Sequence, residues 1–510
     1  MGDPLLRRAF VSGVVLPVLA LAGCQGSGDT ANGESEGAPE VGAPSARAAV
    51  LTWGDEALVS DPSKRGNRTE IDVAIDPLDP SNVLAIAIDW DFPGGFAAKI
   101  FRSADGGKSW ADRGYVPHPK PPIQGACTPR VSADPVIHFD DRGIAYAGYI
   151  AYACVDEGTE SGSLYLLRSE DGGENWEGPF LVHNEHAVYA DGSCYGLDKE
   201  WITTDPVTGS IHFVWMDFIF RACDLSSRGM PIVHRSSDDG GRTWGPISVV
   251  SDPAEYTQGP EPVFLPDGAI VVTYIESIPR AAPRARLCPP DPLRVLTAFE
   301  ESDPLRPSRI ISAQSTDGGT TWSQTVVAEI CSFSLLEATH PLAINEALTL
   351  PRSVYDDVNG AIVLTWSERD YPEPLLHVAR SVDGGLSWTA TTLPDEPGHA
   401  AFLPAVAADR GIAHVLYMST TNAGTYDMLH RSSTNGGLTW STATRLNDGV
   451  LCLCLGLQNT FGREGGLPPY PNVGHYLGLD ARAGLVVPIW PALTQPQGVQ
   501  DLIARPARAG

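Results

Sequence analysis

The chain has 510 residues, of which 35 are Lys or Arg and 62 are Asp or Glu, so its formal net charge at pH 7 is −27. This balance argues against a nucleic-acid partner, which needs a basic groove, and it opposes a polyanionic substrate unless a local basic pocket overrides the field. No phosphate-binding glycine loop, Ser-His-Asp order or metal-ligand motif stands out, so we predict no cofactor and no bound metal.

The first 48 residues have the composition of export and tethering segments. Arg7 and Arg8 precede an apolar stretch that is typical of a signal peptide and too short for a membrane span of about 20 residues. Residues 24–48 are rich in Gly, Ser, Ala and Glu without apolar periodicity, which favours a flexible tether. We therefore expect residues 1–23 to be removed on export.

Cys24 follows Leu21-Ala22-Gly23, and this order resembles a bacterial lipobox. The resemblance implies cleavage before Cys24, a diacylglyceryl group on its sulfur, and a membrane as partner of that anchor. Gln25 would favour the outer membrane in a Gram-negative lipoprotein. The alternative is an ordinary signal peptide with a chance cysteine. The lipobox interpretation predicts an exported lipoprotein of the bacterial cell envelope, at the outer membrane or cell surface.

Six copies of one pattern, Ser-x-Asp-Gly-Gly-x-x-Trp, recur from Ser103 to Trp440, with Asn in place of Asp in the last copy. The Gly-Gly pair supplies the positive φ of a tight turn, the Asp can accept hydrogen bonds from turn amides, and the Trp packs under the turn. We expect structural rather than catalytic roles for Asp105, Asp171, Asp239, Asp317, Asp383 and Asn435.

The repeated pattern resembles the Asp-box (BNR) repeat of the sialidase-like β-propellers. The resemblance implies an all-β propeller of four-stranded antiparallel blades over residues 49–510, with each box between a third and a fourth strand. After the last box, three strand patterns lack a fourth, and the segment from Trp53 echoes the segment from Trp244. We therefore predict seven blades, with the N-terminal strand completing the last blade and closing the ring. Six blades with decorated ends are the alternative.

Eight of the nine cysteines remain once Cys24 is set aside, and an even number in an exported chain favours disulfides. Two predicted pairs flank the first two strands of their blades, and a third lies further on; the three are Cys127–Cys154, Cys194–Cys223 and Cys288–Cys331. The pairing of Cys452 and Cys454 is left open. The alternatives are two separate bridges, one strained bridge, and a metal or redox pair.

The sialidase resemblance also implies site residues. Sialidases hold the sugar carboxylate with three arginines, whose forked guanidinium groups suit a carboxylate, and they use a Tyr activated by a Glu, with an Asp as acid/base. On this pattern, Arg68 is the first arginine and Arg352 the third. Asp89 or Asp91 would be the acid/base, and Glu261 the activating glutamate.

Two positions depart from that pattern. Glu276 stands where the second arginine is expected, with Arg280 a few residues beyond, and Phe402 stands where the tyrosine belongs. A carboxylate repels a sialic acid, and a phenyl ring cannot attack an anomeric carbon. We therefore do not expect conventional retaining exo-sialidase activity, although Tyr476 in the seventh blade is an alternative tyrosine for the same channel.

Three further groups are candidates for the channel mouth. His475 and Tyr476 could bind a sugar, with a packed aromatic as the alternative. Arg280 and its neighbouring arginines could bind an anion or glycan, with a solvated loop as the alternative. Asp198-Lys199-Glu200-Trp201 places opposite charges beside an aromatic, with an internal ion pair between blades as the alternative.

Two functional hypotheses follow from these residues. The first is a monomeric, surface-tethered protein that binds a glycan or a protein at the channel mouth, without conventional sialidase chemistry. The second is an exo-acting glycoside hydrolase that uses Glu261 with Asp89 or Asp91. The fold accommodates both, so the sequence leaves open whether the chain is an enzyme.

Overall fold

The computed structural model describes residues 50–60, 67–92, 96–119, 131–156, 159–184, 194–220, 227–252, 256–277, 306–332, 349–370, 373–395, 398–420, 425–452, 474–493 and 500–509. Within these ranges the regular elements are β-strands, and no helix has the length and apolar character that a membrane span requires. The predicted signal peptide, the tether and Cys24 lie outside the described residues, as do Cys127, Cys223, Cys288 and Arg280.

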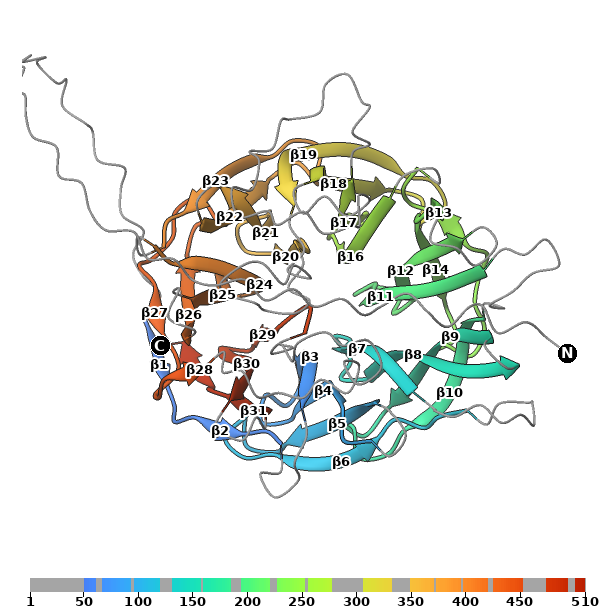
Figure 1. Ribbon diagram of the computed structural model, residues 1–510, viewed down its shortest axis with the longest axis horizontal. Coiled ribbons are helices and arrows are strands. Elements are labelled where there is room, and N and C mark those ends of the chain that lie inside the picture. Colours follow the sequence, from blue (N-terminus) through green and yellow to red (C-terminus); the bar gives the residue numbers. More distant parts are fainter. Residues whose placement is uncertain are drawn as a thin grey trace, which may run out of the picture. The chain divides into compact units, whose positions relative to one another are not determined.

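The strands form seven antiparallel sheets, which we number as blades 1 to 7. Figure 1 shows the sheets in a ring, with β3, β7, β11, β16, β20, β24 and β29 nearest its centre. The prediction of seven four-stranded blades is confirmed, and the six-blade alternative is wrong.

The strands of the first four blades have the following bounds. Blade 1 contains β3 (Arg68–Ile75), β4 (Val83–Asp89), β5 (Ala97–Ser103) and β6 (Ala111–Tyr115). Blade 2 contains β7 (Val131–Phe139), β8 (Ala145–Asp156), β9 (Thr159–Ser169) and β10 (Glu177–Asn184). Blade 3 contains β11 (Cys194–Thr204), β12 (Ile211–Phe220), β14 (Ile232–Ser237) and β15 (Ser248–Val249), with β13 (Ser227–Gly229) on β12. Blade 4 contains β16 (Tyr256–Phe264), β17 (Ile270–Ser277), β18 (Arg306–Ser315) and β19 (Ser323–Ser332).

The remaining blades follow the same order until the last. Blade 5 contains β20 (Arg352–Asp356), β21 (Ala361–Asp370), β22 (Glu373–Ser381) and β23 (Thr389–Leu393). Blade 6 contains β24 (Ala400–Asp409), β25 (Ile412–Thr420), β26 (Thr425–Ser433) and β27 (Thr444–Arg445), with β28 (Leu451–Cys452) on β26. Blade 7 joins β29 (Gly478–Arg482), β30 (Leu485–Leu493) and β31 (Gln500–Ala504) to β2 (Ala57–Leu58), while β32 (Ala507–Ala509) lies between β30 and β1 (Leu51–Trp53).

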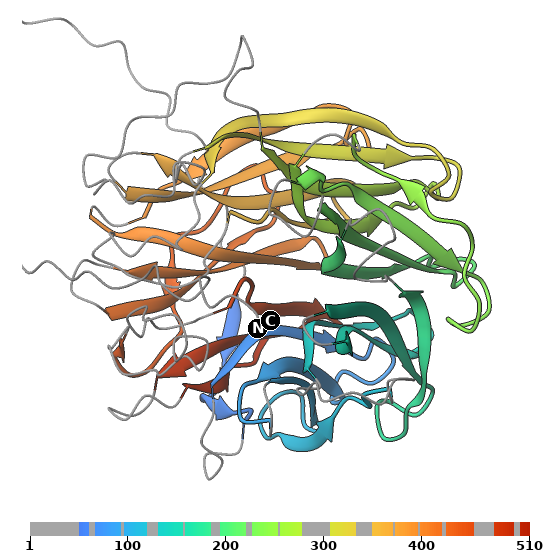
Figure 2. The same ribbon diagram turned by 45° about the vertical axis from the view of Figure 1, so that its right-hand side comes forward.

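The N-terminal segment completes blade 7. Leu58 of β2 pairs with Ile503 of β31, and Figures 1 and 2 show the N-terminal strands beside the C-terminal ones. The N–H of Gly54, which follows Trp53, donates to Pro506 O at 2.8 Å. After the box of blade 3, the glycine that follows Trp244 donates to a strand carbonyl at the same distance of 2.8 Å. The segment after Trp53 therefore occupies the position that the segment after a box occupies in the other blades. The predicted closure is confirmed.

Each Asp-box holds the turn between the third and fourth strands of its blade. In blade 3, Gly241 N donates to Ser237 Oγ (2.9 Å), Asp239 Oδ1 accepts the backbone N–H four residues on (2.8 Å), and Trp244 Nε1 donates to Gly241 O (3.0 Å). Asn435 Oδ1 accepts the equivalent N–H at 2.9 Å. These contacts are those of a structural turn, and they define one face of the ring as the box face. We call the opposite face the mouth face.

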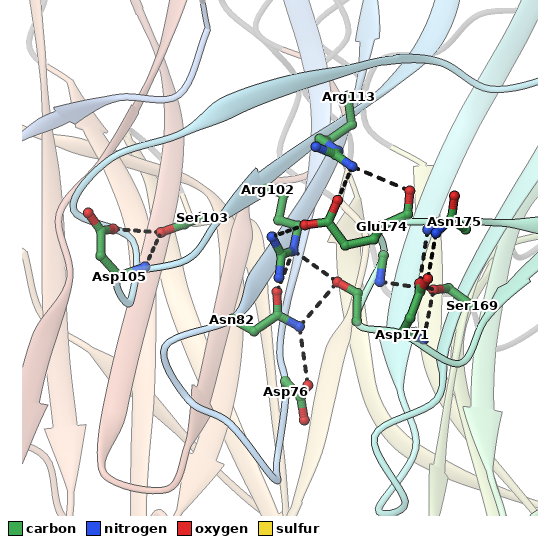
Figure 3. Close-up of polar contacts among 12 residues, drawn as sticks. Asp76, Asn82, Arg102, Ser103, Asp105, Arg113, Ser169, Asp171, Glu174 and Asn175 are labelled. Atoms are coloured by element: carbon green, nitrogen blue, oxygen red, sulfur yellow. Dashed lines mark hydrogen bonds and ion pairs between the residues drawn. The ribbon is translucent and has the colours of Figure 1, made fainter.

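The boxes also join neighbouring blades. Figure 3 shows Arg102 of blade 1 reaching Glu174 of blade 2, at 2.6 Å. The second glycine of a box lies against the preceding blade: a Cβ on Gly241, whose φ is +89°, would lie 2.3 Å from Leu166 Cδ2. The box therefore requires glycine both for its backbone conformation and for the close approach of two blades.

The hydrophobic core lies between successive blades. One cluster combines Ile71 and Val83 of blade 1 with Val487 and Leu502 of blade 7. Because each such cluster is shared by two sheets, the innermost strands are held at fixed positions around the axis.

Candidate functional site

A shared irregularity near the start of the innermost strands positions side chains around the axis. In five of the described innermost strands, two residues stand where the partner strand has one, which is a β-bulge. The first extra residue of each bulge has a positive φ: Glu70 (53°), Asp134 (46°), Lys199 (54°), Gly259 (63°) and Leu403 (47°). Non-glycine residues rarely adopt this conformation, and surrounding contacts must hold them there.

The Lys199 cluster consists of Glu70, Asp134, Asp198, Lys199 and His475. The Lys199 ammonium lies 2.6 Å from Asp134, 3.3 Å from Asp198 and 3.4 Å from Glu70, and His475 Nδ1 contacts Glu70 Oε1. Burial works against the ammonium charge, but the three carboxylates outweigh it and raise the pKa of Lys199 well above its usual value. The cluster joins blades 1, 2, 3 and 7, so the internal ion pair considered for Lys199 is present.

One trio within this cluster has the spacing of a metal site. Single ligand atoms of Glu70, Asp134 and His475 lie within 4.8 Å of one another. The Lys199 ammonium already supplies the positive charge at this point, 2.6 Å from Asp134. We therefore assign no metal to the trio.

Glu261 and Arg352, predicted as acid and third arginine, form a buried ion pair. Arg352 Nε donates to Glu261 Oε2 at 2.9 Å, and the same oxygen accepts the N–H of Ser353 at 2.7 Å. The guanidinium carbon lies 4.1 Å from the centre of the Trp201 ring, which fixes the plane of the group. Burial, partly offset by Arg352, raises the pKa of Glu261. Arg352 Nη1 is buried without a hydrogen-bond partner among the described residues.

A cavity of about 300 Å³ adjoins this pair. Its lining runs along the innermost strands from Asp72, Trp201, Glu261 and Arg352 to Arg482, which ends β29 on the box face. The cavity therefore follows the axis of the ring, with the Arg352 guanidinium at its inner end and its other end on the box face, opposite the mouth face where the sequence predicted a ligand.

Carboxylates tie the innermost strands to one another. Asp72 Oδ2 accepts the N–H of Ile137 in blade 2 at 2.8 Å, and Asp480 Oδ2 of blade 7 accepts the N–H of Ile75 in blade 1 at 2.7 Å. Glu261 makes the same kind of contact from blade 4 to blade 5. Burial raises the pKa of Asp72 to about 7. Glu261 thus has a structural role besides any chemical one.

A second group of predicted residues lies at the mouth end of blade 1. Asp89, which is 1% exposed, receives hydrogen bonds from Lys99 Nζ and Tyr115 Oη, both at 3.2 Å. Arg68 Nη2 lies 3.6 Å from the same carboxylate. Asp91 is exposed at the surface, and the partial desolvation of its carboxyl together with the charge of Asp89 raises its pKa.

Three residues at or near the expected tyrosine and second arginine are in the interior or make contacts within the protein. They are Tyr476, the alternative tyrosine, Phe402 in the tyrosine position, and Glu276 in the arginine position. Tyr476 is 3% exposed, and its hydroxyl donates to Pro135 O at 3.1 Å. Burial and nearby carboxylates raise its pKa well above the usual value, which opposes a phenolate. Phe402 is 1% exposed, and Glu276 pairs with Arg309 at 3.2 Å.

The structure therefore gathers the predicted site residues into two groups rather than one. Glu261, Arg352 and Tyr476 lie around the axis, where the Arg352 guanidinium is 5.8 Å from the centre of the Tyr476 ring. Arg68, Asp89 and Asp91 lie at the mouth end of blade 1, and none of them contacts Glu261 among the described residues. His475 belongs to the Lys199 cluster. The roles assigned to these residues stay predictions.

Cysteine pairing is described at one position. Cys331 is disulfide-bonded, and its predicted partner Cys288 lies outside the described residues. Cys127 and Cys223 also lie outside them, so all three pairings stay predictions.

Sequence reasoning missed Asp72, Lys99 and Tyr115. Asp72 interrupts an otherwise apolar part of β3, and an acid at a core position is a signal that its partners must be found. Lys99 and Tyr115 contact Asp89 from the third and fourth strands of blade 1, and no local pattern links these three positions.

Comparisons with known proteins give distant structural neighbours. No protein-family model matches the chain, and no curated protein matches it. A GH93 α-L-arabinofuranosidase of Fusarium graminearum, solved with arabinobiose, is 12% identical over 89% of this chain and 98% of that one, with a TM-score of 0.47. A Dyadobacter fermentans protein of unknown function is 15% identical over 75% and 98%, with a TM-score of 0.46. A Hadza microbial sialidase is 16% identical over 74% and 65%, with a TM-score of 0.41. At these identities and TM-scores the likeness carries no argument about the function of this chain.

Proposed function

We propose that this chain is an exported, surface-tethered protein whose propeller binds a glycan or a protein in its central channel, without conventional sialidase chemistry. The proposal depends on one observation, which is that only part of the Arg352 guanidinium has a hydrogen-bond partner among the described residues. Nε is bound to Glu261, whereas Nη1 has no partner among the described residues although it is buried beside a cavity of about 300 Å³. A buried donor without a partner is costly, and a ligand oxygen would satisfy it.

The contacts of the other predicted residues support binding over sialidase chemistry. A sialidase needs arginines that are free to hold a carboxylate, yet Arg68 and Arg352 each face a carboxylate of the protein itself. It also needs an activated tyrosine, and the surroundings of Tyr476 raise its pKa instead of lowering it.

The test is binding of the purified full chain to an array of glycans, followed by a paired variant. Arg352→Met with Glu261→Gln removes the guanidinium without leaving a buried charge, and Arg309→Gln serves as a control on a more exposed arginine. We expect the double variant to lose binding at least about tenfold and the control to retain it, which is a difference of about 1.4 kcal/mol. Equal affinity of the double variant and the parent would contradict the role of Arg352.

The second candidate is an exo-acting glycoside hydrolase that uses Glu261 with Asp91 or Asp89. One observation favours it: burial raises the pKa values of Glu261 and Asp91, and a general acid near neutral pH needs such a shift. Asp89 suits this role less, because Arg68, Lys99 and Tyr115 already bind its carboxylate.

A panel of aryl glycosides that includes the sialoside separates the two candidates. Turnover that disappears in Glu261→Gln and Asp91→Asn would establish the hydrolase. Absence of turnover across the panel, with glycan binding retained, would favour the binding protein.

The tether is part of the same proposal. A lipid on Cys24 would hold the propeller at the bacterial envelope through residues 24–48. Incorporation of a labelled fatty acid into the parent but not into Cys24→Ser is the expected result, and equal labelling would contradict lipidation at this residue.

A further inference from the structure

The mouth end of blade 1 carries an aromatic platform, which we define as Phe92 and Tyr115 with the carboxylate of Asp91. The two rings meet edge to face, with centres 4.9 Å apart and planes inclined by 71°. Tyr115 exposes 37% of its surface, Phe92 is half-buried and Asp91 is exposed.

Buried groups beneath the platform hold it in place. Asp89 accepts a hydrogen bond from the Tyr115 hydroxyl and another, at 3.1 Å, from the backbone N–H of Asp91. Lys99 Nζ lies 4.6 Å from the centre of the Tyr115 ring and pairs with Asp112 at 2.8 Å. The ring and the carboxylate are therefore positioned before any ligand arrives, which lowers the entropic cost of binding.

The charges around the platform select the kind of ligand. Among the described residues, the cations at this end of blade 1 are Arg68 and Lys99, which are buried and face Asp89. The exposed charge that the structure describes beside the rings is the carboxylate of Asp91, in a chain whose formal net charge is −27. An anionic sugar would meet repulsion here, whereas hydroxyl groups can donate hydrogen bonds to the carboxylate while an apolar sugar face packs on the rings.

We propose that the platform of Phe92, Tyr115 and Asp91 is a subsite for a neutral saccharide, which packs on the rings and donates hydroxyl hydrogen bonds to Asp91. This inference rests on the proposed glycan binding and adds the class of sugar and the place where it is held. The residues involved are separate from Glu261 and Arg352, so the two assignments can be tested independently.

The experiment measures binding of lactose and of 3′-sialyllactose to the purified full chain by ligand-observed NMR. The two probes share the disaccharide and differ by the anionic sugar. We expect lactose to bind and sialyllactose to bind less tightly. Asp91→Asn should bring the affinities for lactose and sialyllactose closer together, because it removes the exposed charge and keeps the shape of the side chain.

Three variants locate the lactose subsite. Tyr115→Ala should weaken lactose binding at least about tenfold, and Tyr115→Phe should retain binding because the ring remains. Tyr256→Ala is the matched control, since Tyr256 also exposes 37% of its surface and begins β16 at the mouth end of blade 4. Thermal unfolding of each variant checks that the fold is intact.

The outcomes separate the two proposals. Tighter binding of sialyllactose than of lactose, or equal effects of Tyr115→Ala and Tyr256→Ala, would overturn the neutral-saccharide subsite. Glycan binding that depends on Arg352 and is unchanged in Tyr115→Ala would overturn the subsite alone and leave the proposed function standing. Absence of binding to any glycan on the array would overturn both.

Discussion

Two pairs of buried histidines lie at equivalent positions in blades 3 and 6. His212 Nδ1 and His234 Nε2 are 2.9 Å apart, and His414 Nδ1 and His430 Nε2 are 3.1 Å apart. Burial lowers the pKa values of His212 and His414 to about 4 and that of His234 to about 3. It also lowers the pKa of His430 well below its usual value. We expect these pairs to make the fold sensitive to acid.

The size of the effect follows from proton uptake by the unfolded chain. Unfolded histidines bind protons below about pH 6.5, whereas His212 and His414 stay neutral until about pH 4 and His234 until about pH 3, so stability is lost as the pH falls through this window. At about pH 5 each of these three histidines costs about 2 kcal/mol, so the three together cost about 6 kcal/mol, and His430 acts in the same direction. Buried carboxylates act in the opposite direction, because Asp72, with a pKa of about 7, takes up its proton in the folded state.

A double variant isolates the histidine contribution. Urea unfolding of the parent and of the double variant His212→Gln with His234→Gln is measured at about pH 7.5 and at about pH 5. For each protein, the difference between the two measurements is the unfolding free energy that is lost on acidification. We expect the loss to be about 4 kcal/mol smaller in the variant, because two of the four groups no longer titrate and the carboxylate contribution cancels. His399→Gln, outside the pairs, is the control. An unchanged loss in the double variant would refute the reasoning.

Three further substitutions test the boxes, the Lys199 cluster and the ring closure. Gly268→Ala, at φ +87° with open space around the new Cβ, should lower the unfolding free energy by about 1 kcal/mol. Gly241→Ala, at φ +89° against the neighbouring blade, should lower it by at least about 2 kcal/mol more, measured by urea unfolding. Equal costs would contradict the packing of the box. Lys199→Met should cost about 3–5 kcal/mol, measured by thermal unfolding, because it leaves buried carboxylates without their cation; a melting temperature equal to that of the parent would speak against the ion pairs. Trp53→Ala should cost about 2 kcal/mol or more and speed limited proteolysis, while Val50→Ala, at a position 76% exposed, should change neither; equal proteolysis of the two would argue against closure by this segment.

Local patterns predicted the ring well. Each box is a turn whose hydrogen bonds stay within eight residues, so its sequence alone specifies it. The closing strand was also predictable, because the segments after Trp53 and Trp244 are alike and make the same kind of contact with a preceding strand. The missing fourth strand of blade 7 indicated where the N-terminal segment belongs.

The candidate site was harder to predict because its contacts join distant parts of the chain. Glu261 was expected to face a ligand, and it does line the cavity, but it also binds Arg352 and the next strand's backbone. Lys199 contacts Glu70 and Asp134 only because bulges turn all three residues toward the axis, and no composition pattern marks a bulge. The alternation of side chains along a strand predicts correctly which face of the sheet each residue occupies, but only up to such an extra residue.

The pairing of β2 with β31 has a consequence for synthesis. The ribosome makes β2 before blade 1 and β31 only after blade 6, so β2 waits for β31 before its backbone groups are matched. Until then the nascent polypeptide is an open arc with an unpaired strand edge at either end, and such edges recruit other chains. A product of premature termination would keep both edges permanently, which makes incomplete translation a direct route to aggregation for this architecture.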